Sequence, residues 1–396
     1  MSAQIEQKKL DQWADYLIDY SLDGVDENDI VMIKGEAITW PLMRTLKRKV
    51  IQNGAIPDTF VVEPDNDRGQ VWGAEMAKHG SLEQIKRVPE WMETRYKDMT
   101  KYVEILGAEK PDLFADLPQE KSSAIKKADM PLKEIRLSKP WVLTLYPTQA
   151  FADMEDMTLE EYTDIIMQTS LTDPRQLEEV EDPIHEVLDQ SDQITVVTEH
   201  PAENRELTLK LDISDRNIIK CTGKNNFPDG EIFTSPDARR VKGEIFLDLP
   251  VFFDGVNIQG IYLKLEEGQI TDYSAQENEE ALKTIIETDD GSHRLGEVAL
   301  GMNQGLETAL KHPLFVEKVG GTLHIAIGKS YPRCYVDNPN SEESQQKIEE
   351  LKEAGVFNSS AQHVDIVSDF REGGVGKAVY LDDQQIFSED NLWKVK

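Results

Sequence analysis

The strongest constraint on the fold is a change of hydrophobic pattern near residue 194. In the first half, DIVMIKG, WPLMRTLKRKVIQNGA and TFVVEPD follow one another as a strand, a helix and a strand. A second round is expected from a helical region at 82–105 and the strand WVLTLYP at 141–147. Strands joined by helices form parallel sheets, so residues 1–193 are predicted to be an α/β domain with a parallel sheet.

The second half has a different pattern. Short segments in which apolar and polar residues alternate, such as ELTLKLDI, EIFLDLPVFF and IQGIYLKLEEGQI, are separated by turns. Two helices are expected among them, near SAQENEEALKTIIET and NQGLETALKH, and an acidic helix is expected at 173–193. Residues 194–396 are therefore predicted to form a β-rich α+β domain.

The charge of the chain argues against two classes of partner. Its 396 residues include 75 acidic and 43 basic side chains, which gives a formal net charge of -32. Such a chain repels phosphate backbones and anionic lipid, so neither nucleic acid nor a membrane is expected as a partner. The two cysteines, Cys221 and Cys334, cannot form a disulfide framework, and no apolar run reaches about 18 residues. A reducing, cytoplasmic location is expected.

A histidine interrupts an apolar strand in GGTLHIAIGKSY, residues 320–331. Successive side chains of a strand point to opposite faces, so the three aliphatic residues share one face and His324 shares the other with small residues. The default interpretation of His324 is a buried imidazole that makes one hydrogen bond. The other candidate residues decide between that interpretation and a metal ligand.

Four further residues carry the chemistry of metal ligands. In AQHVDIVSDF, His363 and Asp365 would project from one face of a strand and chelate an ion, although the aspartate could instead only orient the imidazole. Glu231 and Glu297 each follow a glycine and, taken singly, are expected at the surface. Together with His324 they make five ligands of the types that hold two divalent ions with a bridging carboxylate.

Four blocks of the second half resemble the thermophilic-aminopeptidase family of metallopeptidases, which includes aminopeptidase T, aminopeptidase S and PepS-type enzymes. The blocks are NNFPDGEIFTSP, HRLGEVALGMNQG, LFVEKVGGTLHIAIGKSY and HVDIVSD, in the family's order. A looser resemblance extends through the first half. It implies a homodimer that removes N-terminal residues from short peptides, with two divalent metal ions per chain. Zinc, cobalt, manganese and iron all accept histidine with carboxylate, so the native metal stays open.

The resemblance also assigns residues. The family's active-site tyrosine falls on Tyr331, and its metal ligands fall on Glu231, Glu297, His324, His363 and Asp365. Glu231 is expected to carry a proton to the leaving amine and Glu297 to bridge the two ions, although these two roles could be exchanged. Tyr331 could donate a hydrogen bond to the oxyanion or could pack at the end of the strand.

Two alternatives to a peptidase stay open at this point. A mononuclear iron(II) ring-cleaving dioxygenase would use His324, His363 and Asp365 as its metal ligands, and it would leave both glutamates without a role. A binding or structural protein with a decayed site is the second alternative, against which the intact ligand set argues. Glu317 and Lys318, in the same block as His324, are expected to form an ion pair on a loop.

Overall fold

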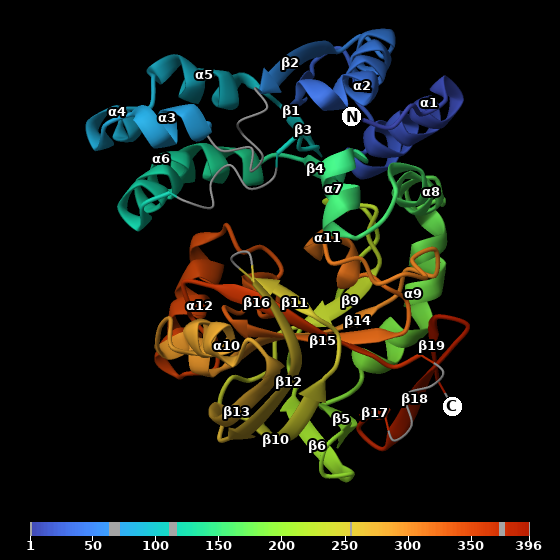
Figure 1. Cartoon of the computed structure of the whole chain (residues 1–396), viewed down its shortest axis with the longest axis vertical. Helices are drawn as coiled ribbons and strands as arrows, with labels where there is room; N and C mark the ends of the chain where they lie inside the picture. Colours follow the sequence, from blue (N-terminus) through green and yellow to red (C-terminus); the bar gives the residue numbers. More distant parts are fainter. Residues whose placement is uncertain (1, 63–71, 111–116, 254–255, 372–376, 396) are drawn as a thin grey trace. The chain divides into compact units, whose positions relative to one another are not determined.

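The computed structural model describes residues 2–62, 72–110, 117–253, 256–371 and 377–395 (Figure 1). Contacts within the chain define two compact units: Met1–Pro174 with Gly223–Pro228, and Arg175–Thr222 with Asp229–Lys396. Helix α9 (Arg175–Leu188) belongs to the second unit because its buried residues Ile184 and Leu188 join the apolar core of that unit. The domain boundary between residues 193 and 194 stays a prediction, and the edge of the contact unit lies before α9.

The first unit contains the predicted parallel sheet. Its strands pair in the order β2-β1-β3-β4-β8, and every pair is parallel. The strand bounds are β1 Ile30–Glu36, β2 Ile56–Val62, β3 Lys101–Leu106, β4 Trp141–Leu145 and β8 Asn226–Phe227. The helices are α1 Gln7–Asp15, α2 Trp40–Gln52, α3 Ala74–His79, α4 Leu82–Lys86, α5 Glu90–Asp98, α6 Gln119–Leu137, α7 Gln149–Met154 and α8 Leu159–Ser170.

One prediction for this unit is wrong in part. Residues 82–105 were expected to be helical, yet only α4 and α5 are α-helices there and β3 begins at Lys101. Tyr102, Val103 and Ile105 are buried where β3 pairs with β1 on one side and β4 on the other. Aromatic and β-branched side chains favour a strand when both neighbours are present, and that context lies outside the local sequence.

The second unit contains two sheets. The larger runs in the order β11-β12-β10-β6-β5-β17-β18-β19, with β13 paired to β12, and the smaller runs in the order β16-β15-β14-β9-β7. The larger sheet consists of β5 Gln193–His200, β6 Arg205–Asp212, β10 Val241–Leu247, β11 Val251–Phe253, β12 Val256–Glu266, β13 Gln269–Glu277, β17 Ala378–Leu381, β18 Gln384–Glu389 and β19 Leu392–Val395. The smaller consists of β7 Ile219–Cys221, β9 Glu231–Thr234, β14 Leu295–Gly301, β15 Thr322–Gly328 and β16 His363–Asp369. One apolar cluster contains residues from both sheets.

The helices of this unit agree with the sequence in two of three cases. Helices α9 and α10 (Glu279–Ile286) lie where they were predicted, and α11 (Pro313–Val316) and α12 (Glu342–Glu353) complete the set of labelled helices. The helix expected near NQGLETALKH is absent from residues 303–312, which the structure describes as irregular chain. There the Asn303 side chain accepts a hydrogen bond from the backbone of Gly305, a local contact that competes with helix formation.

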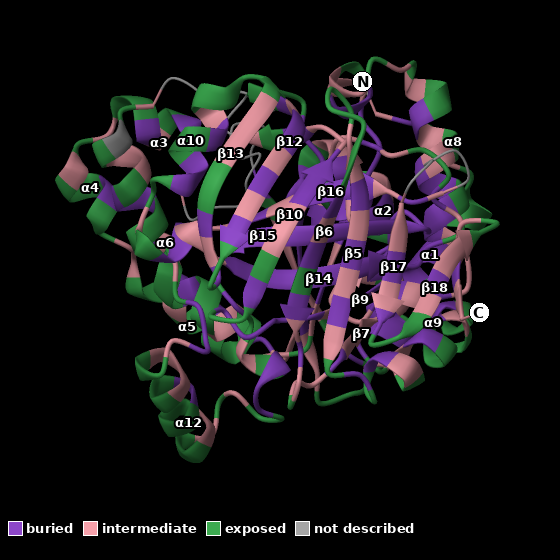
Figure 2. Cartoon of the chain, turned by 90° about the horizontal axis from the view of Figure 1, so that it is seen from below, coloured by how far each residue is buried: buried purple, intermediate pink, exposed green. Residues whose placement is uncertain are grey.

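The smaller sheet carries the most deeply buried strands of the unit. Every residue of β14 and β15 is buried, and both strands are purple along their length in Figure 2. Strand β13, by contrast, has intermediate and exposed residues along most of its length. Polar side chains on β14 and β15 are thus shielded from water and need partners within the protein.

Candidate metal centre

Strand register brings the predicted ligands of the smaller sheet together. Glu297 on β14 pairs with Ala326 on β15, and Ala326 pairs with Asp365 on β16, so these three residues form one row across the sheet. His324 lies two residues before Ala326, and His363 lies two residues before Asp365, on the same faces as the row. The small side chain of Ala326 leaves space between the two carboxylates.

Glu231 joins this group from a fourth strand. It is the first residue of β9 and pairs with Gly301 at the end of β14. Its Oε2 atom lies 3.6 Å from Nε2 of His324, and the residue is only 6% exposed. The expectation that Glu231 and Glu297, taken singly, lie at the surface is therefore wrong, because strand pairing buries both of them.

The five side chains form two overlapping groups that share Glu297. Glu297 Oε1 lies 3.3 Å from Nε2 of His324, and its Oε2 lies 3.1 Å from Nε2 of His363. The donor atoms of Glu231, Glu297 and His324 lie within 4.8 Å of one another, and so do those of Glu297, His363 and Asp365. Each group could hold one ion, and Glu297 directs one oxygen toward each histidine.

The electrostatics of the cluster also point to cations. Burial lowers the pKa of both imidazoles, but the surrounding carboxylates outweigh it and raise the pKa of His324 to about 9 and that of His363 to about 11. Burial raises the pKa of Asp365, but the charge of His363 outweighs it and lowers this pKa to about 2. In the absence of metal, protons on the two imidazoles balance part of the negative charge.

The orientation of His363 fits a metal ligand. Its Nδ1 atom lies 2.7 Å from the carbonyl oxygen of Lys329, which can only accept, so Nδ1 donates and Nε2 faces the carboxylates. Nε2 is buried and makes no hydrogen bond within the described residues, although it lies 3.3 Å from Oδ1 of Asp365. An imidazole nitrogen among carboxylate oxygens is stabilised by a proton or by a metal ion, and the donor types here are those that divalent ions prefer.

Metal binding is expected to release protons at neutral pH. Because pH 7 lies below the raised pKa values of His324 and His363, both imidazoles of the metal-free protein are charged, and each must lose a proton to become a ligand. Metal affinity should therefore rise with pH between 7 and about 9. Calorimetric titration of Zn²⁺ into chelator-stripped protein, in buffers of different ionisation enthalpy, measures the number of protons. His324→Ala should release fewer than wild type, and binding without proton release would contradict the assignment.

Lys318 and Glu317 lie closer to the ligands than the sequence indicated. The expected ion pair is present, with Nζ of Lys318 3.0 Å from Oε2 of Glu317. Nζ also lies 2.7 Å from Oε2 of Glu231, and Lys318 is only 2% exposed. Burial raises the pKa of Glu317 to about 7. A lysine and a glutamate within the apolar block LFVEKVGG were the available signal that these two side chains face the site rather than a solvated loop.

Tyr331 lies beside the cluster, past the end of β15. Its ring contacts the ring of His363, with centroids 4.8 Å apart, and the ring of Phe233, with centroids 5.3 Å apart. Tyr331 is 41% exposed, yet partial desolvation of its hydroxyl and the charges of Glu297 and Asp365 raise its pKa. The phenol therefore keeps its proton at neutral pH and can act as a hydrogen-bond donor.

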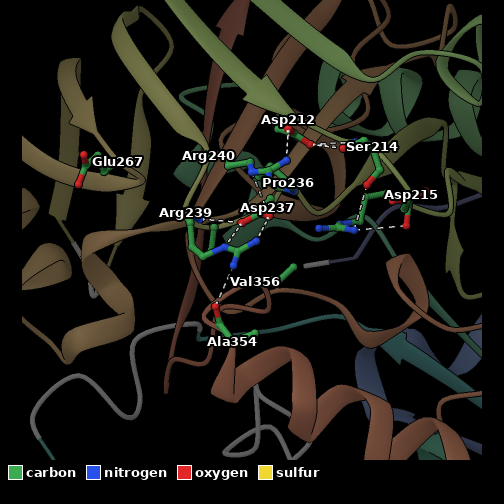
Figure 3. A network of polar contacts seen from close by, with 12 residues as sticks. Asp212, Ser214, Asp215, Pro236, Asp237, Arg239, Arg240, Glu267, Ala354 and Val356 are labelled. Atoms are coloured by element: carbon green, nitrogen blue, oxygen red, sulfur yellow. Dashed lines mark hydrogen bonds and ion pairs between the residues drawn. The ribbon is translucent and has the colours of Figure 1, made fainter.

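A polar network connects the loop that follows β9 to the segment before β16 (Figure 3). The amide of Tyr331 donates to Oγ of Ser235, 3.0 Å away, in the loop that follows β9. In the same loop Asp237 accepts hydrogen bonds of 3.0 and 2.7 Å from the guanidinium of Arg239, which also donates to the carbonyl of Ala354 at 3.2 Å. These contacts hold the loop to the segment before β16 and so hold Tyr331 against the cluster.

Curated proteins similar to this chain are aminopeptidases. Aminopeptidase 2 of Geobacillus stearothermophilus is 37% identical over 158 residues, which are 38% of this chain and 37% of that protein. Aminopeptidase T of Thermus aquaticus is 34% identical over 31% of this chain and 30% of that protein, and aminopeptidase AmpS of Bacillus subtilis (strain 168) is 32% identical over 46% of each. The matches thus span between about a third and a half of the length of these relatives.

A solved structure has the same fold. Wild-type AmpT from Thermus thermophilus matches with a TM-score of 0.73 and 19% identity, over 98% of this chain and 97% of that one. This agreement confirms the predicted fold class, an α/β part with a parallel sheet followed by a β-rich part.

The comparisons also bear on the alternative functions that the sequence left open. They give no support to an iron(II) dioxygenase, and the two glutamates that this alternative leaves unused lie inside the cluster. No helix in the described ranges is long and apolar enough to cross a membrane. The model of the thermophilic metalloprotease (M29) family matches residues 6–377, and the chain belongs to this family.

Proposed function

We propose that this protein is a metal-dependent aminopeptidase that removes N-terminal residues from short peptides. The observation that carries the proposal is the pair of buried ligand groups that share Glu297, within a chain of a metalloprotease family. The names of the similar curated proteins support the same activity.

The proposed cofactors are two divalent ions per chain, with zinc, cobalt and manganese as the candidates. Glu231, Glu297 and His324 would hold one ion, and Glu297, His363 and Asp365 the other, with Glu297 as the bridge. When bound, such ions lower the pKa of water and polarise the carbonyl of the substrate.

The chain's own residues would supply the remaining steps. Glu231 would accept the proton of the attacking water and pass it to the leaving amine. The hydroxyl of Tyr331 donates a hydrogen bond to the oxyanion that forms on the substrate carbonyl. The ring of His363, against which Tyr331 packs, keeps the phenol on this side of the cluster.

Further properties are proposed on the resemblance and the charge. The protein is proposed to act in the cytoplasm as a homodimer on short peptide substrates. Its net charge of -32 supports the expectation that nucleic acid and membranes are not its partners.

The experiment that tests the activity is a peptide panel. Chelator-stripped protein is incubated with short peptides, free or N-acetylated, with and without added zinc, cobalt or manganese. Metal-dependent release of the first residue, blocked by acetylation, is expected because an aminopeptidase requires a free α-amino group. Release from acetylated peptides at the same rate would point to an endopeptidase, and no release with any ion would overturn the proposal.

A further inference from the structure

We propose that Cys221, Asp229 and Glu231 form a third cation position, which takes a thiophilic divalent ion such as Zn²⁺ or Cd²⁺ beside the metal centre. The sulfur of Cys221 and the carboxylate oxygens of the other two residues all lie within 4.8 Å of one another. Strand pairing sets this spacing, because Cys221 on β7 is the direct partner of Glu231 on β9. Asp229 lies two residues before Glu231 and is buried.

A fourth candidate donor, Glu181, lies on helix α9. Glu181 is completely buried, and neither of its carboxyl oxygens has a hydrogen-bond partner among the described residues. Helix α9 packs against β7 and β9, and the carboxyl group of Glu181 interacts electrostatically with Asp229, Glu231 and Cys221. Burial raises the pKa of Glu181 to about 9. A buried carboxyl without a partner costs stability, and an ion in the group would give it one.

The negative charge of the group formed by Cys221, Asp229 and Glu231 could be balanced by a divalent ion. Lys318 supplies one positive charge, through its contact of 2.7 Å with Oε2 of Glu231, and shares that charge with Glu317 at 3.0 Å. Asp229 and Glu231 together exceed what one ammonium group can neutralise. A divalent ion would compete with Lys318 for Glu231, and it would also gain the sulfur, which an ammonium group cannot coordinate.

The donor set determines which ion this position takes. Thiolate is a soft ligand that favours Zn²⁺ and its heavier relatives over Mg²⁺ or Ca²⁺, whereas the five ligands of the metal centre contain no sulfur. Binding forms a sulfur–metal bond and breaks the S–H bond of Cys221, and the proton leaves to solvent. As a residue, Cys221 is half-buried.

The position has a consequence that rests on the proposed peptidase activity. Glu231 also belongs to the proposed metal centre. An ion held by Cys221 and Asp229 would coordinate the same carboxylate that the proposed proton transfer uses. Excess zinc or cadmium should therefore inhibit peptide hydrolysis, and Cys221→Ser should require at least about tenfold more metal for the same inhibition, since one strong ligand is lost.

Cobalt gives the direct test, because a cobalt–thiolate bond produces a charge-transfer absorption band in the near ultraviolet that oxygen and nitrogen ligands do not. Co²⁺ is titrated into chelator-stripped full-length protein, and the band is followed together with bound cobalt per chain. The expected result is a band that grows after the cobalt of the metal centre has bound, that persists in Cys334→Ser, and that is absent in Cys221→Ser. Cys334 is the matched control because it lies in a separate apolar cluster.

The outcomes separate this site from the proposed activity. No band in the wild-type protein at full loading, or a band that survives Cys221→Ser, would overturn the third position even if peptides are hydrolysed. A band without hydrolysis would leave the third position standing and refute the peptidase. Glu181→Gln is the second variant: it keeps the sulfur, and it should weaken binding of the band-forming cobalt without removing the band.

Discussion

Replacing His324 with alanine is expected to lower kcat/KM for a short peptide by roughly 10³-fold or more. The imidazole of His324 lies 3.6, 3.3 and 3.9 Å from Glu231, Glu297 and Asp365. Its loss removes a ligand from one group, and metal assistance contributes several kcal/mol to such reactions, at about 1.36 kcal/mol per tenfold change in rate. Steady-state kinetics at saturating metal, together with elemental analysis of bound metal, measures both effects.

The matched control for this variant is His79→Ala. His79 lies on α3 in the first unit, its side chain is 77% exposed, and it belongs to neither ligand group. This variant should keep wild-type kinetics and metal content. Full activity in His324→Ala, with folding verified by circular dichroism, would refute the assignment of His324 as a metal ligand.

Replacing Tyr331 with phenylalanine is expected to lower kcat by about 10²–10³-fold with little change in KM, which is the usual loss when one donor to an oxyanion is removed. The phenyl ring can keep the contacts with His363 and Phe233, so the fold and the bound metal should be unchanged. Kinetics and metal analysis on the same preparation distinguish this effect from a loss of metal.

Tyr380→Phe serves as the control for the loss of a phenol. Tyr380 lies on β17 in the larger sheet of the same unit and is half-buried. Its variant should match wild type. If Tyr331→Phe also keeps wild-type kcat, the phenol only packs at the end of β15, which was the alternative interpretation of the sequence.

The sequence suffices to propose the ligands because alternation along a strand is a local property. His363 and Asp365 are two residues apart, and the single imidazole of an otherwise apolar strand identified His324. The distances between strands are not local. That Glu297 and Asp365 flank one alanine depends on the pairing of three strands from residues 295 to 369, and only the structure provides this register.

The features that local sequence does not predict also depend on contacts between segments that are distant along the chain. Local sequence predicts a helix through β3, whereas the strand forms because it pairs with β1 and β4, which come from distant segments. The expected ion pair of Lys318 with Glu317 is present, but local sequence does not indicate the second partner of Lys318, Glu231, because it is distant along the chain. Glu181 resembled any other acid of an acidic helix until packing of α9 buried it completely.

The row formed by Glu297, Ala326 and Asp365 makes the proposed metal site depend on the correct register of three strands. A slip of one residue between β14 and β15, or between β15 and β16, would turn the ligands of one strand to the opposite face. Ion binding therefore depends on native register in three strands at once and, once achieved, stabilises that register against all others. A protein that has bound metal at this site has therefore paired the three strands in the native register, since a sheet in another register does not bring the proposed ligands together.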